Sequence, residues 1–143
     1  RSCYIDKNCV WSANDEELTL IEAPKKIDSG MSSVLKFAFD DRFSKVRSKG
    51  KKYKVNSITL EKLLDKYNAP KVIDYISIDT EGSEYETLKN FNFEKYSFRF
   101  ITCEHMYVQK KRENIFKLLN SNGYERICEH ISAQDDWYIR KTN

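Results

Sequence analysis

Acidic side chains directly follow an apolar run in the middle of the chain. The run Val72–Ile78 is rich in β-branched residues and is followed by Asp79, Glu81 and Glu84. Such a run is typical of a strand that is buried on both faces of a parallel sheet. Because open α/β sheets bind their ligands beyond the carboxyl ends of the strands, these carboxylates are predicted to form a site.

A second predicted strand brings further polar groups to the same edge. Phe98–Cys103 is largely apolar and is followed by Glu104 and His105. Consecutive strands are neighbours roughly two-thirds of the time, so these groups should lie beside Asp79 and Glu81. Carboxylates gathered there could bind a divalent cation through oxygen, or take a proton from a substrate hydroxyl. An imidazole titrates near neutral pH, so His105 is either a general base or a structural hydrogen-bond partner.

Four other residues are further candidates for this site. Glu84 falls near the start of a helix predicted from Ser83, where a carboxylate also complements the helix dipole. Asp135, Asp136 and Trp137 could close over the same edge, with the indole stacking on a flat ligand. A polar turn followed by a core aromatic residue explains these three residues equally well, so both interpretations stand.

The elements that position these residues alternate between helix and strand. A helix is predicted after Thr59, a natural N-cap, because apolar residues repeat at helical spacing up to Tyr67. A second long helix is predicted at about 112–122, and Tyr124–Ile131 and Trp137–Ile139 are predicted to form an antiparallel strand pair. This order implies right-handed crossovers and an α/β fold with a doubly wound, mostly parallel sheet and an antiparallel C-terminal strand pair.

The N-terminal third is predicted to contain short strands and a basic segment. Strand regions are expected at Cys3–Ser12, Leu18–Ala23 and Val34–Phe39. Arg42–Lys54 holds seven basic residues around Gly50, which predicts a basic hairpin or a mobile lid. This segment is either a solvated loop or a surface that attracts an anionic substrate.

The composition excludes several classes of protein. The 143 residues are expected to form one domain, 1–143, and a net charge of +3 gives no reason to expect a nucleic-acid partner. No apolar run is long enough to span a membrane. The four cysteines show no CxxC spacing, so a zinc site is not expected, and the thiols are expected to be reduced, as in a cytoplasmic protein. The four glycines are scattered, so the sequence has neither a GxGxxG fingerprint nor a GxSxG elbow.

Several segments resemble the carboxyl-terminal two-thirds of the FkbM-type methyltransferases. They are IDYISIDTEGSEYETLKNF, FRFITCEH, IFKLLNSNGY and QDDWYIRK, and the family motif I-D-x-E-G-x-E is matched by Ile78, Asp79, Glu81, Gly82 and Glu84. The resemblance implies a Rossmann-like fold and an S-adenosylmethionine-dependent O-methyltransferase that acts on a hydroxyl of a sugar or small metabolite.

If the chain is such a methyltransferase, roles can be expected for individual residues. Asp79 and His105 would be catalytic, and the substrate would be bound by Glu81, Glu84, Glu104, Asp135, Asp136 and Trp137, with a divalent cation as a further possibility. The segment Cys9–Asp15 resembles the third strand of the family, which places Trp11, Ser12 and Ala13 near the adenine end of the cofactor. The first strand, the glycine-rich loop and the acidic residue that ends the second strand have no counterpart. The N-terminal part of the fold is therefore expected to be truncated, and the chain alone is expected to bind S-adenosylmethionine poorly.

Two alternatives to a methyltransferase remain open. A truncated sheet exposes an edge, so the chain could be a non-catalytic binding or assembly module, including a homodimer formed through that edge. A metal-dependent hydrolase built on Asp79, Glu81, Glu104 and His105 is the other alternative.

Overall fold

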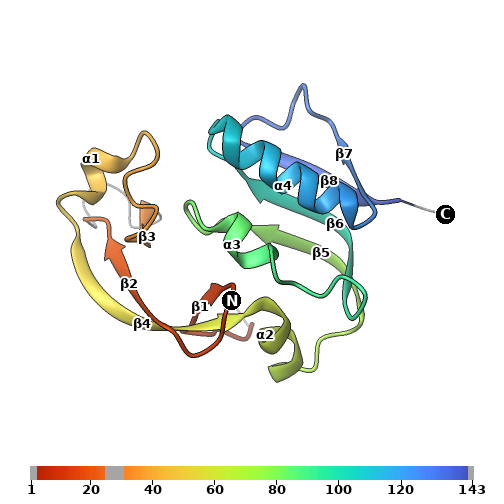
Figure 1. The fold of residues 1–143 in the computed structure, drawn as a ribbon, viewed down its shortest axis with the longest axis horizontal. Coiled ribbons are helices and arrows are strands. Elements are labelled where there is room, and N and C mark those ends of the chain that lie inside the picture. Colours follow the sequence, from red (N-terminus) through yellow and green to blue (C-terminus); the bar gives the residue numbers. More distant parts are fainter. Residues whose placement is uncertain (1–2, 25–30, 142–143) are drawn as a thin grey trace.

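Two four-stranded sheets form the scaffold of the protein (Figure 1). The structure is a computed structural model that describes residues 3–24 and 31–141. The N-terminal sheet has the strand order β1-β4-β2-β3, and the C-terminal sheet has the order β5-β6-β8-β7. None of the helices in these two ranges is long and apolar enough to cross a membrane.

The long strand β4 (Lys51–Thr59) organises the N-terminal sheet. Its first six residues pair antiparallel with β2 (Glu17–Glu22), and its last three pair parallel with β1 (Cys9–Trp11). β3 (Ser33–Val34) pairs with β2, and the short helix α1 (Ser44–Arg47) precedes β4. The basic segment predicted as a hairpin or lid therefore forms a helix and the beginning of an inner strand.

The C-terminal sheet carries the two strands that were predicted to end at a common edge. β5 (Val72–Ile78) and β6 (Ser97–Glu104) pair in parallel, which confirms the predicted arrangement. β8 (Asp135–Arg140) pairs antiparallel with β6, and β7 (Tyr124–Ile127) pairs antiparallel with β8, which confirms the predicted C-terminal pairing. The first strand of this pair ends at Ile127, however, and does not extend to Ile131 as predicted.

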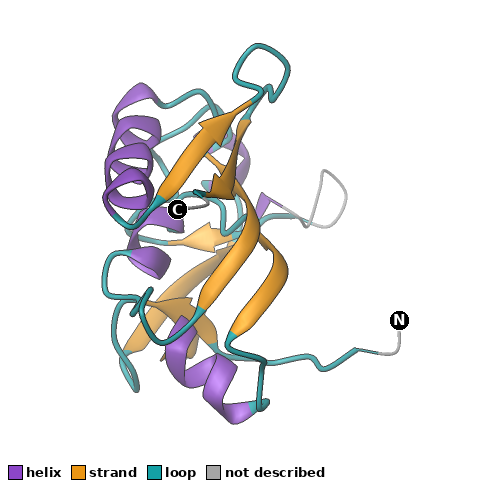
Figure 2. Cartoon of the chain, turned by 90° about the vertical axis from the view of Figure 1, so that its right-hand side faces the viewer, coloured by secondary structure: helices purple, strands orange, loops and turns teal. Residues whose placement is uncertain are grey.

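The helices of this half connect the strands and cover one face of the sheet. α2 (Leu60–Lys66) leads into β5, α3 (Glu84–Leu88) joins β5 to β6, and α4 (Gln109–Ser121) joins β6 to β7. Figures 1 and 2 show α3 and α4 over the same face of the C-terminal sheet. The core lies between this face and these helices, because the apolar stripes of the helices meet the inward side chains of the strands. It includes Ile78, Leu88, Phe98, Ile101, Cys103, Ile115, Leu119, Tyr124 and Tyr138.

The opposite face of the C-terminal sheet carries an open row of aromatic side chains. The Tyr75 ring stacks on Phe100 with centroids 5.8 Å apart, and Phe100 meets Trp137 edge-on at 6.2 Å. Tyr75 is 54% exposed and Ile139 is 37% exposed. No described helix packs on this row, so the sheet is covered on one face and is not doubly wound within the described residues.

The prediction of a mostly parallel sheet is wrong as well. Only two of the six strand pairings in the described ranges are parallel, and the remaining four are antiparallel. The antiparallel pairings are those of β2 with β3 and β4, and those of β8 with β6 and β7. The fold is thus mixed α/β with two mixed sheets.

Local predictions succeed where the apolar pattern is strong. Val72–Ile78 has the predicted bounds, and the Thr59 hydroxyl accepts a hydrogen bond from the Lys62 N–H at 3.2 Å, as an N-cap should. The strand predicted at 3–12 covers only Cys9–Trp11, and the strand predicted at 34–39 ends at Val34 and continues as turns. Short segments with mixed polarity carry little periodic information, which explains both differences.

Candidate functional site

Three carboxylates meet where β5 and β6 end. The parallel register pairs Ile78 with Cys103, so the residues that follow them, Asp79 and Glu104, emerge at the same edge of the sheet. One oxygen each from Asp79, Glu81 and Glu104 lie within 4.8 Å of one another. This confirms the predicted meeting of these three residues.

A cavity of about 210 Å³ opens beside these carboxylates. Asp79 is exposed, whereas only 8% of Glu81 and 4% of Glu104 remain accessible to solvent. The two buried acids and the exposed one therefore face a small polar space that a ligand can enter. The cavity is lined by Met31, Arg42, Phe43, Asp79, Glu81, Glu104, Met106 and Gln134.

Burial and mutual repulsion raise the pKa values of the two buried acids. Burial raises the pKa of Glu104 to about 8, and the negative charges of Asp79 and Glu81 add to the effect. Burial also raises the pKa of Glu81 to about 7, although the guanidinium of Arg47 acts in the opposite direction. The cluster therefore retains a proton near neutral pH unless a cation enters it.

The turn that carries Glu81 has an unusual backbone, which explains the role of Glu84. Glu81 has φ +52° and Gly82 has φ +111°, both in the left-handed region that favours glycine. One carboxylate oxygen of Glu84 accepts hydrogen bonds from the N–H groups of Thr80 at 3.1 Å and Gly82 at 2.9 Å. The Ser33 hydroxyl donates to the Glu81 carbonyl at 2.6 Å. Glu84 thus holds the turn in shape, and its substrate-binding role stays a prediction.

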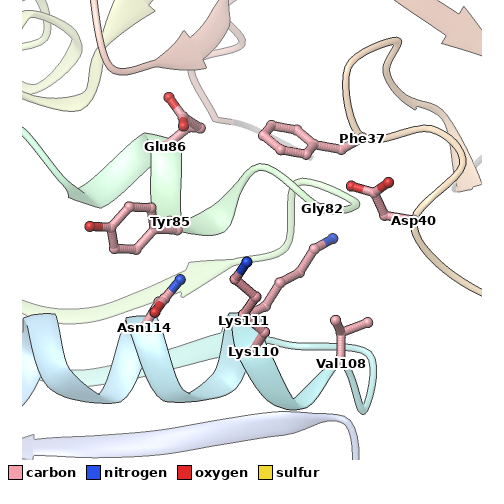
Figure 3. A pocket seen from close by; sticks show the side chains of 9 residues that line it. All are labelled: Phe37, Asp40, Gly82, Tyr85, Glu86, Val108, Lys110, Lys111 and Asn114. Carbon is pink, nitrogen blue, oxygen red and sulfur yellow. The ribbon is translucent and has the colours of Figure 1, made fainter.

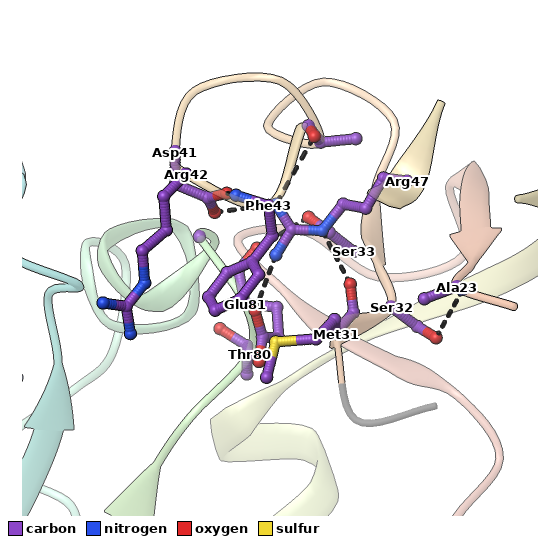
Figure 4. A network of polar contacts seen from close by, with 12 residues as sticks. Ala23, Met31, Ser32, Ser33, Asp41, Arg42, Phe43, Arg47, Thr80 and Glu81 are labelled. Atoms are coloured by element: carbon purple, nitrogen blue, oxygen red, sulfur yellow. Dashed lines mark hydrogen bonds and ion pairs between the residues drawn. The ribbon is translucent and has the colours of Figure 1, made fainter. Parts of the chain in front are cut away.

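A buried arginine fixes this turn to the N-terminal half of the protein (Figure 4). Arg47, which is fully buried, donates to both carboxylate oxygens of Asp41 at 2.8 and 2.7 Å and to Glu81 Oε2 at 2.6 Å. Its Nε–H also donates to the carbonyl of Met31 at 2.6 Å. Sequence analysis could not predict this contact, because Arg47 is one of seven basic residues in the segment 42–54.

His105 does not line the acidic cavity. Its Nδ1 accepts a hydrogen bond from the Tyr107 N–H at 3.0 Å. Its Nε2 is buried, has no hydrogen-bond partner among the described residues, and lies 3.7 Å from Asp136 Oδ1. Burial lowers the pKa of the imidazole, and the positive charge of Arg112 acts in the same direction. A neutral, structural histidine fits this environment, and a catalytic role for His105 stays a prediction.

Asp136 points away from the cavity, unlike its neighbours in β8. Successive side chains of a strand point to opposite faces, so Asp135 shares a face with its pairing partner Glu104. Asp136 lies on the helix-covered face, where Arg112 donates to both of its oxygens at 2.7 to 3.1 Å and Arg126 donates at 3.2 Å. Burial opposes ionisation of Asp136, but these arginines hold its pKa below the usual range. The interpretation of Asp135 and Asp136 as a polar turn is wrong, because these two residues begin β8.

Asp135 and Trp137 remain on the same face as the carboxylate cluster. Burial raises the pKa of Asp135, and the charge of Asp79 contributes to the shift. The Trp137 ring contacts Phe100 on the open aromatic row. Asp135 therefore lies next to the cluster, because it pairs with Glu104. Trp137 lies two residues further along β8, where it pairs with Thr102.

The three residues predicted near the cofactor lie at the end of β1. Trp11 is buried and its ring lies 5.9 Å from that of Phe37. The Ser12 hydroxyl donates to Glu86 at 3.0 Å, and the Ala13 carbonyl accepts from the Ser57 hydroxyl at 2.8 Å. The polar groups of Ser12 and Ala13 are thus engaged within the protein.

A larger cavity of about 460 Å³ lies next to Gly82 (Figure 3). It is bounded by the beginning of α3, the first half of α4 and the segment around Phe37, and its lining carries groups of both charges, namely two lysines and two acidic residues. A pocket of this size can hold a small molecule. Its lining residues are Phe37, Asp40, Gly82, Tyr85, Glu86, Val108, Lys110, Lys111 and Asn114.

Comparison with known proteins identifies the family. The family model described as Methyltransferase FkbM domain matches residues 4–126, which include β5, the acidic turn and β6. Neither the curated proteins nor the solved structures contain a significant match. The match covers most of the chain, and the acidic cluster at the strand ends lies within it. The chain therefore belongs to the FkbM methyltransferase domain family.

Proposed function

We propose that the protein is an S-adenosylmethionine-dependent O-methyltransferase that methylates a hydroxyl of a sugar or another small metabolite. The observation that carries this proposal is the exposed carboxylate of Asp79 in a cavity that also holds Glu81 and Glu104. Carboxylate oxygens accept hydrogen bonds from hydroxyl groups and can accept a proton from one of them. Membership of a methyltransferase family supplies the reaction type.

The acidic cavity fits the charge of the cofactor that the family implies. S-adenosylmethionine, when bound, supplies a methyl group on a positively charged sulfur, which makes that methyl electrophilic. Negative charge from Asp79, Glu81 and Glu104 is complementary to such a cation. The engaged polar groups of Ser12 and Ala13 give weaker support for the predicted adenine contact, so we assign no step of the reaction to them.

The protein has two tasks in this reaction. It orients the acceptor oxygen in line with the methyl carbon, and it takes the proton that the hydroxyl loses as the new O–C bond forms. Asp79 is the residue best placed to take the proton, because its side chain is exposed and it lines the cavity. Glu81 and Glu104 would hold neighbouring hydroxyls of the acceptor.

The test is methyl transfer by the full-length protein with Asp79 replaced. Asp79→Asn keeps the size of the side chain and removes the base, so production of S-adenosylhomocysteine with hydroxylated acceptors should fall at least a hundredfold. Asp74→Asn is the matched control, because Asp74 is on the same strand, is exposed and contacts only the exposed Arg99 among described ion pairs. Undiminished turnover by Asp79→Asn would reject the assignment of the base.

A second candidate function is assembly through the free edge of β5. β5 is the outermost strand of its sheet in the described ranges, and Val72 and Tyr75 on it are more than half exposed. An unpaired edge offers N–H and C=O groups to another strand, so two copies could pair in a homodimer. Sedimentation of the protein as a monomer at high concentration would exclude this dimer, and calorimetric titration with S-adenosylmethionine separates a cofactor-binding enzyme from a module that does not bind it.

A further inference from the structure

The three clustered carboxylates leave one buried oxygen without a partner. Glu104 is 4% exposed, and its Oε2 makes no hydrogen bond with any described residue. The side chain lines the same cavity as Asp79 and Glu81. A buried polar atom without a partner is costly, and native structures nearly always supply one. An unpartnered oxygen on a side chain that lines the cavity indicates that a ligand supplies the missing partner.

The charges around the cavity indicate the sign of that ligand. Asp41, Asp79, Glu81 and Glu104 contribute four carboxylates, whereas the nearby guanidinium groups are those of Arg47 and Arg42. Arg47 is shared between Asp41 and Glu81, and Arg42 donates to the Gln134 side chain at 3.2 Å. When all four carboxylates are ionised, two negative charges remain, and Asp135 lies beside them on the paired strand. One divalent cation would balance the two negative charges that Arg42 and Arg47 leave unpaired.

The spacing of the oxygens fits a single ion. Ca²⁺ binds oxygen at about 2.3–2.6 Å, so two ligands on opposite sides of it lie up to about 5 Å apart. One carboxylate oxygen from each of Asp79, Glu81 and Glu104 falls within 4.8 Å of the other two. Mg²⁺ needs about 2.1 Å to each oxygen, which requires a contraction of the cluster by a few tenths of an ångström. A donor set of oxygens alone favours such hard ions over zinc or copper.

We propose that Asp79, Glu81 and Glu104 bind one divalent cation of the Mg²⁺, Mn²⁺ or Ca²⁺ type. Glu81 already gives Oε2 to Arg47, which leaves Oε1 for the ion, and Glu104 contributes its unpartnered Oε2. The site does not depend on methyl transfer. If the proposed function holds, an ion held by these three residues would supply a Lewis acid next to the acceptor hydroxyl, and the second oxygen of Asp79 would be free to take the proton of that hydroxyl.

The test is calorimetric titration of the chelator-treated, full-length protein with MgCl₂, MnCl₂ and CaCl₂ at pH 8. At least one of these ions should bind with a stoichiometry of one, and Asp79→Asn and Glu104→Gln should each weaken its affinity at least tenfold. Asp79→Asn keeps the test valid if Glu104→Gln does not fold, because Asp79 is exposed. Glu125→Gln is the control, because Glu125 is an exposed acid on β7 outside the cluster.

Two results would overturn the site: no binding of any of the three ions at millimolar concentration, or equal affinity in Asp79→Asn and the wild type. Parallel assays of methyl transfer separate this proposal from the proposed function. Ion binding without methyl transfer supports the site and rejects the activity, whereas methyl transfer in a protein that binds none of the ions rejects the site alone.

Discussion

Replacement of Arg47 by methionine should strongly destabilise the protein. The side chain is fully buried and donates hydrogen bonds to Asp41, Glu81 and the Met31 carbonyl. Methionine has a similar length but no donors, so two carboxylates that are 2% and 10% exposed lose their counter-ion. Removal of one partner from a buried ion pair costs about 3–5 kcal/mol. That is a large part of the roughly 5–15 kcal/mol that stabilises a typical domain.

Urea denaturation followed by the fluorescence of the buried Trp11 measures this loss. The loss should be largest near pH 8 and smaller near pH 5, because burial raises the pKa of Glu81 to about 7 and its protonation at low pH removes one of the two unpaired charges. Arg47→Lys should recover only part of the stability, since an ammonium group cannot contact both carboxylates in the same fork geometry. Lys45→Met in the same helix, at an exposed position, should change stability by less than about 0.5 kcal/mol. A loss of under about 1 kcal/mol for Arg47→Met at pH 8 would refute this account of the buried network.

Three further predictions concern the acidic turn and the helix that precedes β5. The pKa of Glu104 is raised to about 8, so its contribution to stability is present at low pH and is lost as the pH rises from about 4.5 through 8. Without divalent cations, the free energy of unfolding of the wild type should therefore fall between pH 6 and 9 by roughly 2 kcal/mol more than that of Glu104→Gln. Gly82→Ala should cost about 1–2 kcal/mol, because φ is +111° and the new Cβ would lie 2.9 Å from Lys111 Nζ. Thr59→Ala should cost about 1 kcal/mol, because it removes the N-cap hydrogen bond to Lys62.

Each of these predictions has a clear contrary result in the same denaturation assay. Parallel pH profiles for Glu104→Gln and the wild type would show that Glu104 is ionised at the same pH in both folded and unfolded states. Gly123→Ala is a useful comparison for Gly82→Ala, because Gly123 has φ +83° and nothing within 4 Å of its added Cβ. If both substitutions lower the free energy of unfolding equally, backbone strain alone would explain the effect at Gly82, and the expected steric contact there would be rejected. Thr59→Ser should retain the cap, and a loss equal to that of Thr59→Ala would contradict the capping interpretation.

The sequence was sufficient for the elements whose patterns are local and long enough to read. The apolar run 72–78 and the capped helical repeat after Thr59 each appear where they were predicted, because apolar patterns of this length are local to the chain. The predicted burial of 72–78 on both faces is wrong, because β5 is an edge strand of which only Ile78 is buried. The meeting of Asp79 with Glu104 also followed from the sequence, since two consecutive parallel strands with similar lengths bring their ends to one edge.

Tertiary structure alone decided which polar residues share a cavity. The direction of each side chain in β8 depends on register, and a shift of one residue exchanges the faces, so the sequence could not separate Asp135 from Asp136. Nor could it show that Arg47, one of several basic residues in its segment, is buried against Asp41 and Glu81. Such long-range contacts leave no periodic trace along the chain, because the partners are fixed by how distant segments pack.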